Sequence, residues 1–132
     1  FDFITVRDDM AYAEEVKELG AKVHKIPSAR KNPIGAYRSL LKIIEENDYD
    51  VIHINISSLV NIVPIIAAKR GKVPKIIVHS HNNGMEGKKY KFFLHQLNKY
   101  ITKPMKLQRL ACSKSAGQFM FDGEPFKYSK MQ

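Results

Sequence analysis

Short apolar runs and segments of helical periodicity alternate along the whole chain. The runs rich in isoleucine and valine have the length of β-strands, and the segments between them repeat apolar residues every three or four positions, as amphipathic helices do. We expect strands at 3–6, 23–26, 49–54, 75–78 and 107–112. We expect helices at 12–19, 37–44, 59–70 and 88–105, and a last helix from 114 onward.

Polar and special residues mark the ends of several of these helices. The candidate N-caps are Asp8 or Asp9, Ser57 or Ser58, and Ser113. Gly20 and Gly71 are placed to end helices, and Pro64 should either kink its helix or lie near the first turn. The residues of the helix at 59–70 are apolar nearly all round, so we expect this helix to be central.

Strand, helix and strand in short succession predict an α/β fold. The runs Tyr49–Ile54 and Lys75–Val78 show little alternation, which is typical of parallel strands covered on both faces. Right-handed βαβ crossovers then give a Rossmann-like, doubly wound, mostly parallel sheet in a single domain spanning 1–132. Because the chain opens inside an apparent strand at Phe1, we expect it to be a partial domain. Ligands of such folds bind beyond the carboxyl ends of the strands.

Polar side chains gather at these predicted strand ends. The candidate site residues are His53, Asn55, His79, His81, Asn82 and Ser113. Histidine can act as a general base near neutral pH or orient a hydroxyl by hydrogen bonding. On an extended backbone His79 and His81 point the same way, because they are two residues apart. The alternative for His53 is a structural histidine that bonds only to backbone.

Several other kinds of site lack their usual residues. A zinc site needs three or four ligands, but the chain has one cysteine, Cys112, and no carboxylate between Val78 and Met85, so we expect no metal. The glycines are scattered and form no phosphate-binding loop, and no nucleophile elbow is present. We therefore expect no cofactor. We also expect Cys112, at the end of an apolar run, to be a buried structural thiol.

The chain carries an excess of positive charge that bears on the kind of partner it binds. Lys and Arg number 22 against 13 Asp and Glu, a formal net charge of +9. Such an excess attracts nucleic acid, anionic lipid headgroups or phosphorylated substrates, or it only keeps the surface solvated. No recognised nucleic-acid motif is present, so we expect no nucleic-acid partner. A single cysteine and the lack of a signal-peptide pattern favour the cytoplasm.

The segment Lys88–Met105 has two possible roles. It carries apolar residues on one side and several lysines elsewhere, a composition typical of a helix lying on an anionic membrane. It can equally bury its aromatic side in the domain core and solvate the lysines. The core role is the expectation here, because so small a domain needs that apolar face.

Three stretches together resemble the N-terminal domain of family-4 glycosyltransferases, the retaining GT-B class that includes capsular and exopolysaccharide enzymes. They are YDVIHINISS (Tyr49–Ser58), KIIVHSHNNG (Lys75–Gly84) and LACSKSAGQFMF (Leu110–Phe121). The order and spacing of these stretches carry the resemblance, which covers nearly the whole chain. One departure is visible, because Asn55 stands where close relatives often have a second histidine.

The resemblance implies an activity and roles for particular residues. The whole enzyme would transfer a hexose from a nucleotide-sugar donor to a saccharide or lipid-linked acceptor, with retention and without a metal. His81 matches the histidine that contacts the reacting sugar or acceptor hydroxyl. His53 matches the cleft-side histidine, and Ser113 matches the serine that opens a helix near the domain crossover. Asn55 would position rather than exchange a proton.

The resemblance also implies that this chain is the acceptor-side half only. A first strand with a glycine-rich turn would precede Phe1, and a donor-binding domain would follow Gln132. The chain alone would then be inactive, and its basic surface would suit a peripheral enzyme at the inner face of the cell membrane. Two alternatives stay open, a non-catalytic Rossmann-like module that binds a polyanion or nucleic acid, and another α/β enzyme such as a sugar-nucleotide epimerase.

Overall fold

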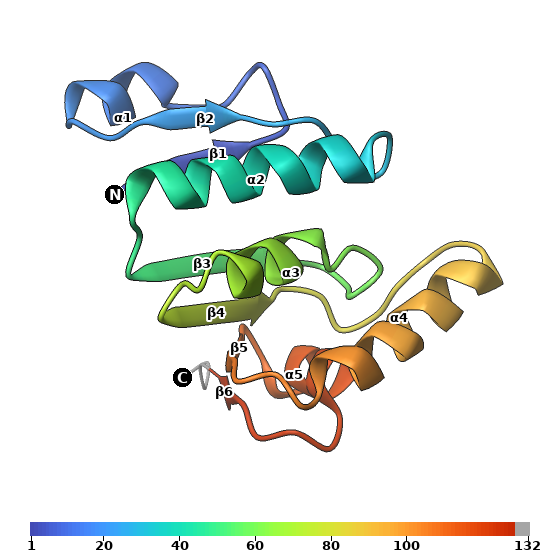
Figure 1. The fold of residues 1–132 in the computed structure, drawn as a ribbon. Coiled ribbons are helices and arrows are strands. Elements are labelled where there is room, and N and C mark those ends of the chain that lie inside the picture. The colour runs from blue at the N-terminus through green and yellow to red at the C-terminus, as the bar shows by residue number, and fades with distance from the viewer. Residues whose placement is uncertain (129–132) are drawn as a thin grey trace.

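The computed structural model describes residues 1–128, in which strands and helices alternate as the pattern predicts (Figure 1). The strands are β1 (Phe3–Thr5), β2 (Val23–Lys25), β3 (Val51–Ile56), β4 (Lys75–Ser80), β5 (Gln108–Ala111) and β6 (Lys127–Tyr128). The helices are α1 (Ala13–Glu18), α2 (Pro33–Asn47), α3 (Val63–Arg70), α4 (Lys89–Thr102) and α5 (Lys114–Phe121). The sequence pattern did not reveal β6, which has two residues.

All the paired strands are parallel, which confirms the predicted Rossmann-like α/β class. β1 pairs with β2, while β3, β4, β5 and β6 pair in that order. The single sheet that we expected is therefore divided into two. The division falls between β1 and β3, and Figure 1 shows α2 lying along it, between the smaller sheet and the larger one.

The hydrophobic core lies between the larger sheet and the helices α2, α3 and α5. Ile54 of β3 and Val78 of β4 point into it from the sheet, and Ile44, Ile65 and Met120 fill it from the helices. Each is fully or almost fully buried, and burying such a side chain contributes about 1.5–3 kcal/mol. Packing in this core fixes the positions of β3 and β4, and so the positions of the polar residues at their carboxyl ends.

The prediction that β3 is covered on both faces is wrong. Ile54 is buried, but Val51 is 48% exposed and the side chains of His53 and Asn55 are also exposed. Isoleucines alternate with these three residues along the strand, which is the period of a half-buried strand. The side chains on the exposed face of β3 are therefore free to take part in a site.

Two of the predicted helix caps are also wrong. Asp8 is engaged by Lys25 and Asp9 by Arg7, so neither caps α1, which begins after Tyr12 with no side-chain cap. Ser57 and Ser58 lie in a non-helical segment that precedes α3. Instead, α3 begins at Val63 because Pro64 has no N–H to donate and is accommodated only in a first turn. The predicted ends at Gly20 and Gly71 are confirmed.

The expectation that α4 buries its aromatic side is wrong as well. The buried residues of α4 are His95, Asn98 and Thr102, whereas Phe93 is 67% and Tyr100 is 79% exposed. The inward side of this helix is polar because it satisfies the backbone of the segment before α3. The Leu59 N–H donates to His95 Nδ1 at 2.9 Å, and Asn98 Nδ2 donates to the Leu59 carbonyl oxygen at 2.6 Å.

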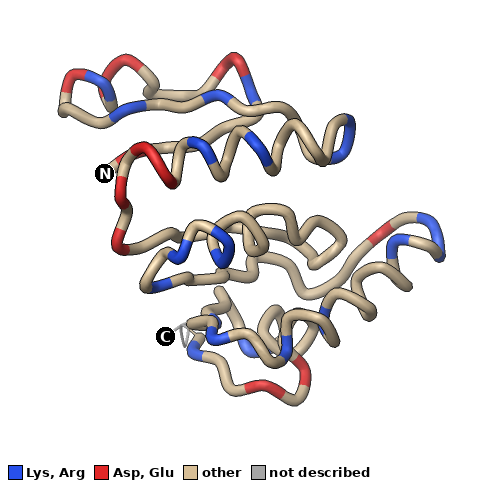
Figure 2. Tube along the Cα trace, viewed as in Figure 1, with Lys and Arg blue, Asp and Glu red and all other residues tan. Residues whose placement is uncertain are grey.

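Basic residues are spread over most elements, with a group at the first turn of α4 (Figure 2). Within residues 1–128, no helix is both long and apolar enough to cross a membrane.

Candidate functional site

Four of the predicted site residues form one connected group at the carboxyl ends of β3 and β4. His81 Nε2 lies 2.8 Å from Asn55 Oδ1, and His53 Nε2 lies 3.2 Å from His79 Nδ1. The rings of His79 and His81 lie with their centroids 4.4 Å apart, and those of His53 and His79 stack at 5.3 Å. We call His53, His79 and His81 the histidine cluster. The prediction that His79 and His81 point the same way is confirmed.

The parallel register of β3 and β4 explains this convergence. Asn55 is paired with His79 and His53 with Ile77, so equivalent side chains of the two strands project from the same face. β4 extends two residues beyond the predicted end at Val78, so His79 and Ser80 lie inside the strand. His81, the first residue after β4, still donates its backbone N–H to the Ile56 carbonyl oxygen. That bond fixes the position from which the His81 ring reaches Asn55.

The hydrogen bonds of the cluster constrain its protons. The oxygen of Asn55 can only accept, so His81 Nε2 carries the hydrogen of that bond. Partial burial, followed by repulsion from His81 and His53 when they are charged, lowers the pKa of His79. The bond from His53 to His79 also requires one of its two nitrogens to be unprotonated. Partial burial therefore favours the neutral form of His79.

Ser113 lies near this group but uses its hydroxyl differently. As predicted, Ser113 caps α5, and its Oγ accepts the Ala116 N–H at 3.1 Å. The preceding residue, Cys112, donates its S–H to the His81 carbonyl oxygen at 3.2 Å and is half-buried, so the expectation of a buried thiol is wrong. Within residues 1–128, no hydrogen bond joins Ser113 to the histidine cluster or to Asn55. Its predicted role at a cleft stays a prediction.

A hollow of about 670 Å³ lies beside the cluster at the carboxyl ends of β3 and β4. The segment after β3 contributes Ser57 and Ser58, and the loop after β4 contributes Asn82 and four further residues. Those four are Asn83, Gly84, Met85 and Glu86. Asn82 is thus placed at the wall of a polar hollow, while His53, His79 and His81 are not among its lining residues. The hollow is large enough for a sugar ring, and small-molecule sites commonly have volumes of about 300–1,000 Å³.

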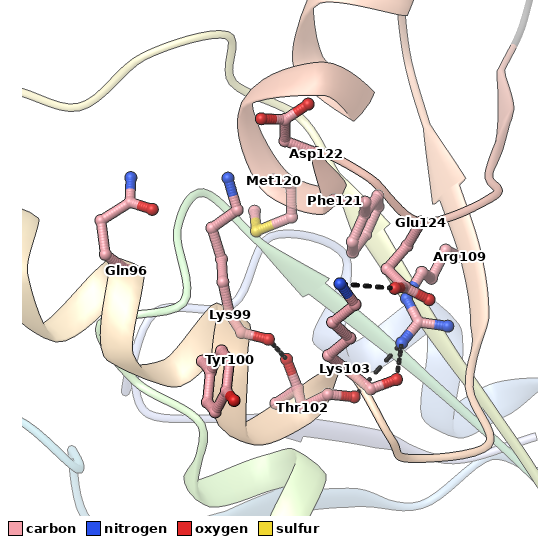
Figure 3. Close-up of a pocket in the computed structure, with 10 residues that line it drawn as sticks. All are labelled: Gln96, Lys99, Tyr100, Thr102, Lys103, Arg109, Met120, Phe121, Asp122 and Glu124. Carbon is pink, nitrogen blue, oxygen red and sulfur yellow. Dashed lines mark hydrogen bonds and ion pairs between the residues drawn. The ribbon is translucent and has the colours of Figure 1, made fainter.

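A second, smaller pocket of about 210 Å³ lies between α4, β5 and α5 (Figure 3). Of its charged side chains, all but that of Asp122 are engaged by other groups of the fold. Lys103 Nζ is 3.8 Å from Glu124 Oε1, and Arg109 donates to the Thr102 and Lys103 carbonyl oxygens at the end of α4. These contacts hold the end of α4 against β5 and the segment after α5. The residues that line this pocket therefore have a structural role in packing α4 against its neighbours.

Among residues 1–128, no group of three or more His, Cys, Asp or Glu side chains is arranged to hold a metal ion. The histidine cluster itself is held by stacking and by a nitrogen-to-nitrogen hydrogen bond.

Parallel strands joined by helical crossovers define a Rossmann-like domain, a class in which ligands bind at the carboxyl edge of the sheet. A family model described as "Glycosyl transferase 4-like" matches residues 4–115, most of the chain. The chain belongs to this glycosyltransferase family, and the resemblance to family-4 enzymes is confirmed. No curated protein and no solved structure matches it at a significant level.

The sequence pattern missed several residues of the hollow. It favours Ser57 and Ser58 as helix caps, and it gives Met85 and Glu86 no role. A signal for them does exist, because both segments follow strands whose carboxyl ends form the ligand edge of the sheet. The pattern predicts a helix from Leu59, whereas α3 begins at Val63. The segment after β3 is therefore longer than predicted, and the pattern assigns Ser57 and Ser58 to a helix start instead of to a loop.

Proposed function

We propose that this chain is the acceptor-side domain of a glycosyltransferase that moves a hexose from a nucleotide-sugar donor to a saccharide or lipid-linked acceptor. The reaction would serve polysaccharide biosynthesis and retain the configuration at the anomeric carbon. The observation that carries the proposal is the His81–Asn55 pair, which lies at the ligand edge of the sheet in a member of a glycosyltransferase family.

The His81–Asn55 bond gives His81 a defined task. Because Nε2 carries the hydrogen of that bond, Nδ1 of a neutral His81 is left with its lone pair. We assign Nδ1 the role of accepting a hydrogen bond from the acceptor hydroxyl and so orienting its oxygen toward the anomeric carbon. During transfer, the acceptor oxygen forms a bond to that carbon, the bond from the carbon to the donor phosphate oxygen breaks, and the nucleotide leaves with the hydroxyl proton on its phosphate. Asn55 is then a positioning residue that sets the tautomer of His81.

The same arrangement suggests how the neighbouring residues would take part. The His79 ring lies against that of His81 and stacks on the ring of His53, so these two histidines would keep the His81 ring in place. Asn82, at the wall of the 670 Å³ hollow, would hydrogen-bond sugar hydroxyls. Ser113, at the N-terminus of α5, would face the second domain. The donor would be held mainly by a separate nucleotide-sugar domain, and no cofactor or metal is part of the proposal.

We further propose that this domain is a partial one, and the division of its sheet supports this. The Lys75 N–H donates to the Asp50 carbonyl oxygen and the His81 N–H to that of Ile56, so the even-numbered residues of β3 bond to β4. In a parallel ladder, the backbone groups of Val51, His53 and Asn55 then point to the other edge. Among residues 1–128, β1 lies on that side and is itself paired only with β2. One more parallel strand between β1 and β3 would complete a single sheet.

The place of action belongs to the proposal too. We propose a cytoplasmic enzyme that works at the inner face of the cell membrane, where nucleotide sugars and lipid-linked acceptors meet. The excess of basic residues supports this location, since phosphorylated carriers and anionic headgroups are both negatively charged.

The direct test is a transfer assay with a panel of UDP- and GDP-sugars. The protein should carry this chain together with the donor-binding domain, and the chain alone serves as the control. We expect nucleotide release and a glycosylated product only when both domains are present, with the donor configuration retained. A folded two-domain protein that neither binds nor consumes any nucleotide sugar would overturn the proposal.

A further inference from the structure

The most unusual surface of the molecule is the outward side of α4. Its residues Tyr90, Phe93, Leu97, Tyr100 and Ile101 recur at helical spacing and are all exposed. We call these five residues the aromatic face. An exposed apolar group of this size on one helix is typical of a surface that contacts another body. The opposite side of α4 already serves the fold through His95 and Asn98, so within residues 1–128 the helix packs mainly through that side and leaves the aromatic face exposed.

The charged residues of the segment that carries the aromatic face are all basic. The segment 88–106 contains six lysines and no aspartate or glutamate. Lys88 and Lys89 are exposed at the start of α4, and neither has an ion-pair partner among residues 1–128. Figure 2 shows these basic positions at the end of α4 that projects away from the sheet. The surface therefore combines apolar rings with an uncompensated positive charge.

From these observations we propose that the aromatic face of α4 and its flanking lysines bind an anionic lipid surface. A bilayer of this kind supplies both complements, an apolar layer for the rings and negative headgroups for the lysines. Tyrosine is also suited to such a boundary, because its ring can sit among acyl chains while its hydroxyl stays hydrated. A second copy of the chain fits less well, since a symmetric contact through this helix would bring two sets of lysines together.

The position of α4 gives this surface a functional meaning. The helix starts just after the loop that lines the 670 Å³ hollow, and its first turn extends beyond the carboxyl ends of the strands (Figure 1). Binding through the aromatic face would hold the hollow and His81 close to the headgroups. This deepens the proposed function by favouring a lipid-linked acceptor over a free saccharide, and in that respect rests on it.

Vesicle flotation with the chain tests the proposal without any sugar transfer. We expect binding to phosphatidylcholine vesicles that contain phosphatidylglycerol, weak binding to phosphatidylcholine alone, and weaker binding as salt is raised. The double substitution Lys88→Gln/Lys89→Gln should weaken binding roughly 10- to 30-fold, as expected for two lysines near an anionic surface. The matched control is Lys69→Gln/Arg70→Gln, an adjacent exposed pair on α3 with the same loss of charge, which should change binding little.

The apolar part of the surface needs its own variant. Phe93→Ser should weaken binding roughly tenfold, as expected for the loss of a ring from an apolar layer. Its control is Ile34→Ser on α2, since Ile34 is 64% exposed and Phe93 67%. Equal vesicle binding by Phe93→Ser and the parent would overturn the proposal, as would no binding to anionic vesicles.

Sedimentation equilibrium distinguishes a lipid surface from a second copy of the chain. The parent and Phe93→Ser are compared for self-association. A dimer that Phe93→Ser dissociates, with no vesicle binding by the parent, would identify a second copy as the occupant and overturn the lipid proposal. A parent that stays monomeric and binds anionic vesicles is the result we expect.

The transfer assay reports the proposed function separately from the lipid surface. Lipid binding without transfer would support the lipid-binding surface and overturn the proposed transfer reaction. Transfer without lipid binding would support the reaction and overturn the lipid-binding surface.

Discussion

His81 Nε2 lies 2.8 Å from Asn55 Oδ1, and this bond joins residues that are 26 positions apart in the chain. It forms because β3 and β4 are adjacent and parallel, which brings their carboxyl ends to one edge. An amide oxygen has no hydrogen to donate, so the bond to Asn55 requires the hydrogen to be on Nε2 of His81 and thereby sets its tautomer. The role that we propose for His81 depends on this relationship.

A double-mutant cycle on unfolding measures the His81–Asn55 bond. We expect His81→Ala and Asn55→Ala to show a coupling of about 0.5–1.5 kcal/mol, the usual net contribution of a hydrogen bond. Urea unfolding of the parent, both single variants and the double variant provides the four free energies. Asn55→Ala combined with Gln96→Ala is the control and should be additive, because Gln96 lines the other pocket. Additivity of the first pair would show that the bond is absent in solution.

The Asp2 carboxylate provides a prediction about pH. Tyr49 donates its hydroxyl to Asp2 Oδ2 at 2.5 Å, and this bond, followed by one from the Lys22 N–H, lowers the pKa of Asp2 to about 2. A lowered carboxyl pKa stabilises the fold above pH 4, and that contribution is lost as the pH falls toward 2. Tyr49→Phe should raise the pKa of Asp2, as followed by its side-chain NMR shift. An unchanged pKa would mean that the hydroxyl does not hold Asp2.

The buried ring of His95 predicts loss of stability in mild acid. Burial lowers the pKa of His95, because the charged imidazolium would lose its hydration inside the protein. Repulsion from Lys99 adds a smaller effect in the same direction. The Leu59 N–H bonds to Nδ1, so protonation there would also break this contact. The neutral ring therefore stabilises the fold above the ordinary histidine pKa of about 6.5, and this is lost as the pH falls below it.

His95→Gln is the variant that checks this prediction. We expect the free energy of unfolding of the parent to fall between about pH 7 and pH 5, and that of His95→Gln to fall less. His79→Gln is a useful companion, because the lowered pKa of His79 contributes with the same sign. Parallel curves for the parent and both variants would show that neither ring governs the acid sensitivity.

Gly117 marks a close approach between α5 and the segment after it. A Cβ at this position would lie 2.0 Å from an edge atom of the Phe126 ring. Gly117→Ala should therefore destabilise the fold by about 1–3 kcal/mol, the usual cost of overpacking. Gly84→Ala, where the added carbon would meet nothing within 4 Å, is the control in the same thermal unfolding measurement. Equal melting temperatures for the two variants would contradict the packing described for α5.

Local signals in the sequence predict local structure well. Ser113 and Gly71 are assigned from short-range chemistry, and both act as predicted, because a serine oxygen or a helix-ending glycine depends only on its neighbours. Asp8 and Asp9 fail as caps for a reason that is not local. Their carboxylates are taken by Lys25 and Arg7, and the first of these lies 17 residues away.

The orientation of α4 could not be predicted from its periodicity. A helical repeat shows that two sides differ but does not say which side faces the core, and the apolar side was the natural choice. The outcome is decided by the segment before α3, where the N–H and carbonyl of Leu59 are buried and need partners. His95 and Asn98 supply them, and an unpaired buried group would cost about 1–3 kcal/mol.

The candidate site was predicted in part for a general physical reason. Parallel strands end at one edge, so residues that follow them converge whatever the rest of the chain does. This placed Asn55, His79 and His81 together. The wall formed by Ser57 and Ser58 could not be found in this way, because it depends on where α3 begins.

The most direct test of the proposed role of His81 is the turnover number of its alanine variant in the two-domain enzyme. With a nucleotide-sugar donor and an acceptor at saturating concentrations, His81→Ala should lower kcat by roughly 10²- to 10⁴-fold, as for the loss of a group that acts on a reacting hydroxyl. The melting temperature should stay close to that of the parent, since the His81 side chain is exposed. An unchanged kcat in a folded variant would remove His81 from the reaction and contradict the site described here.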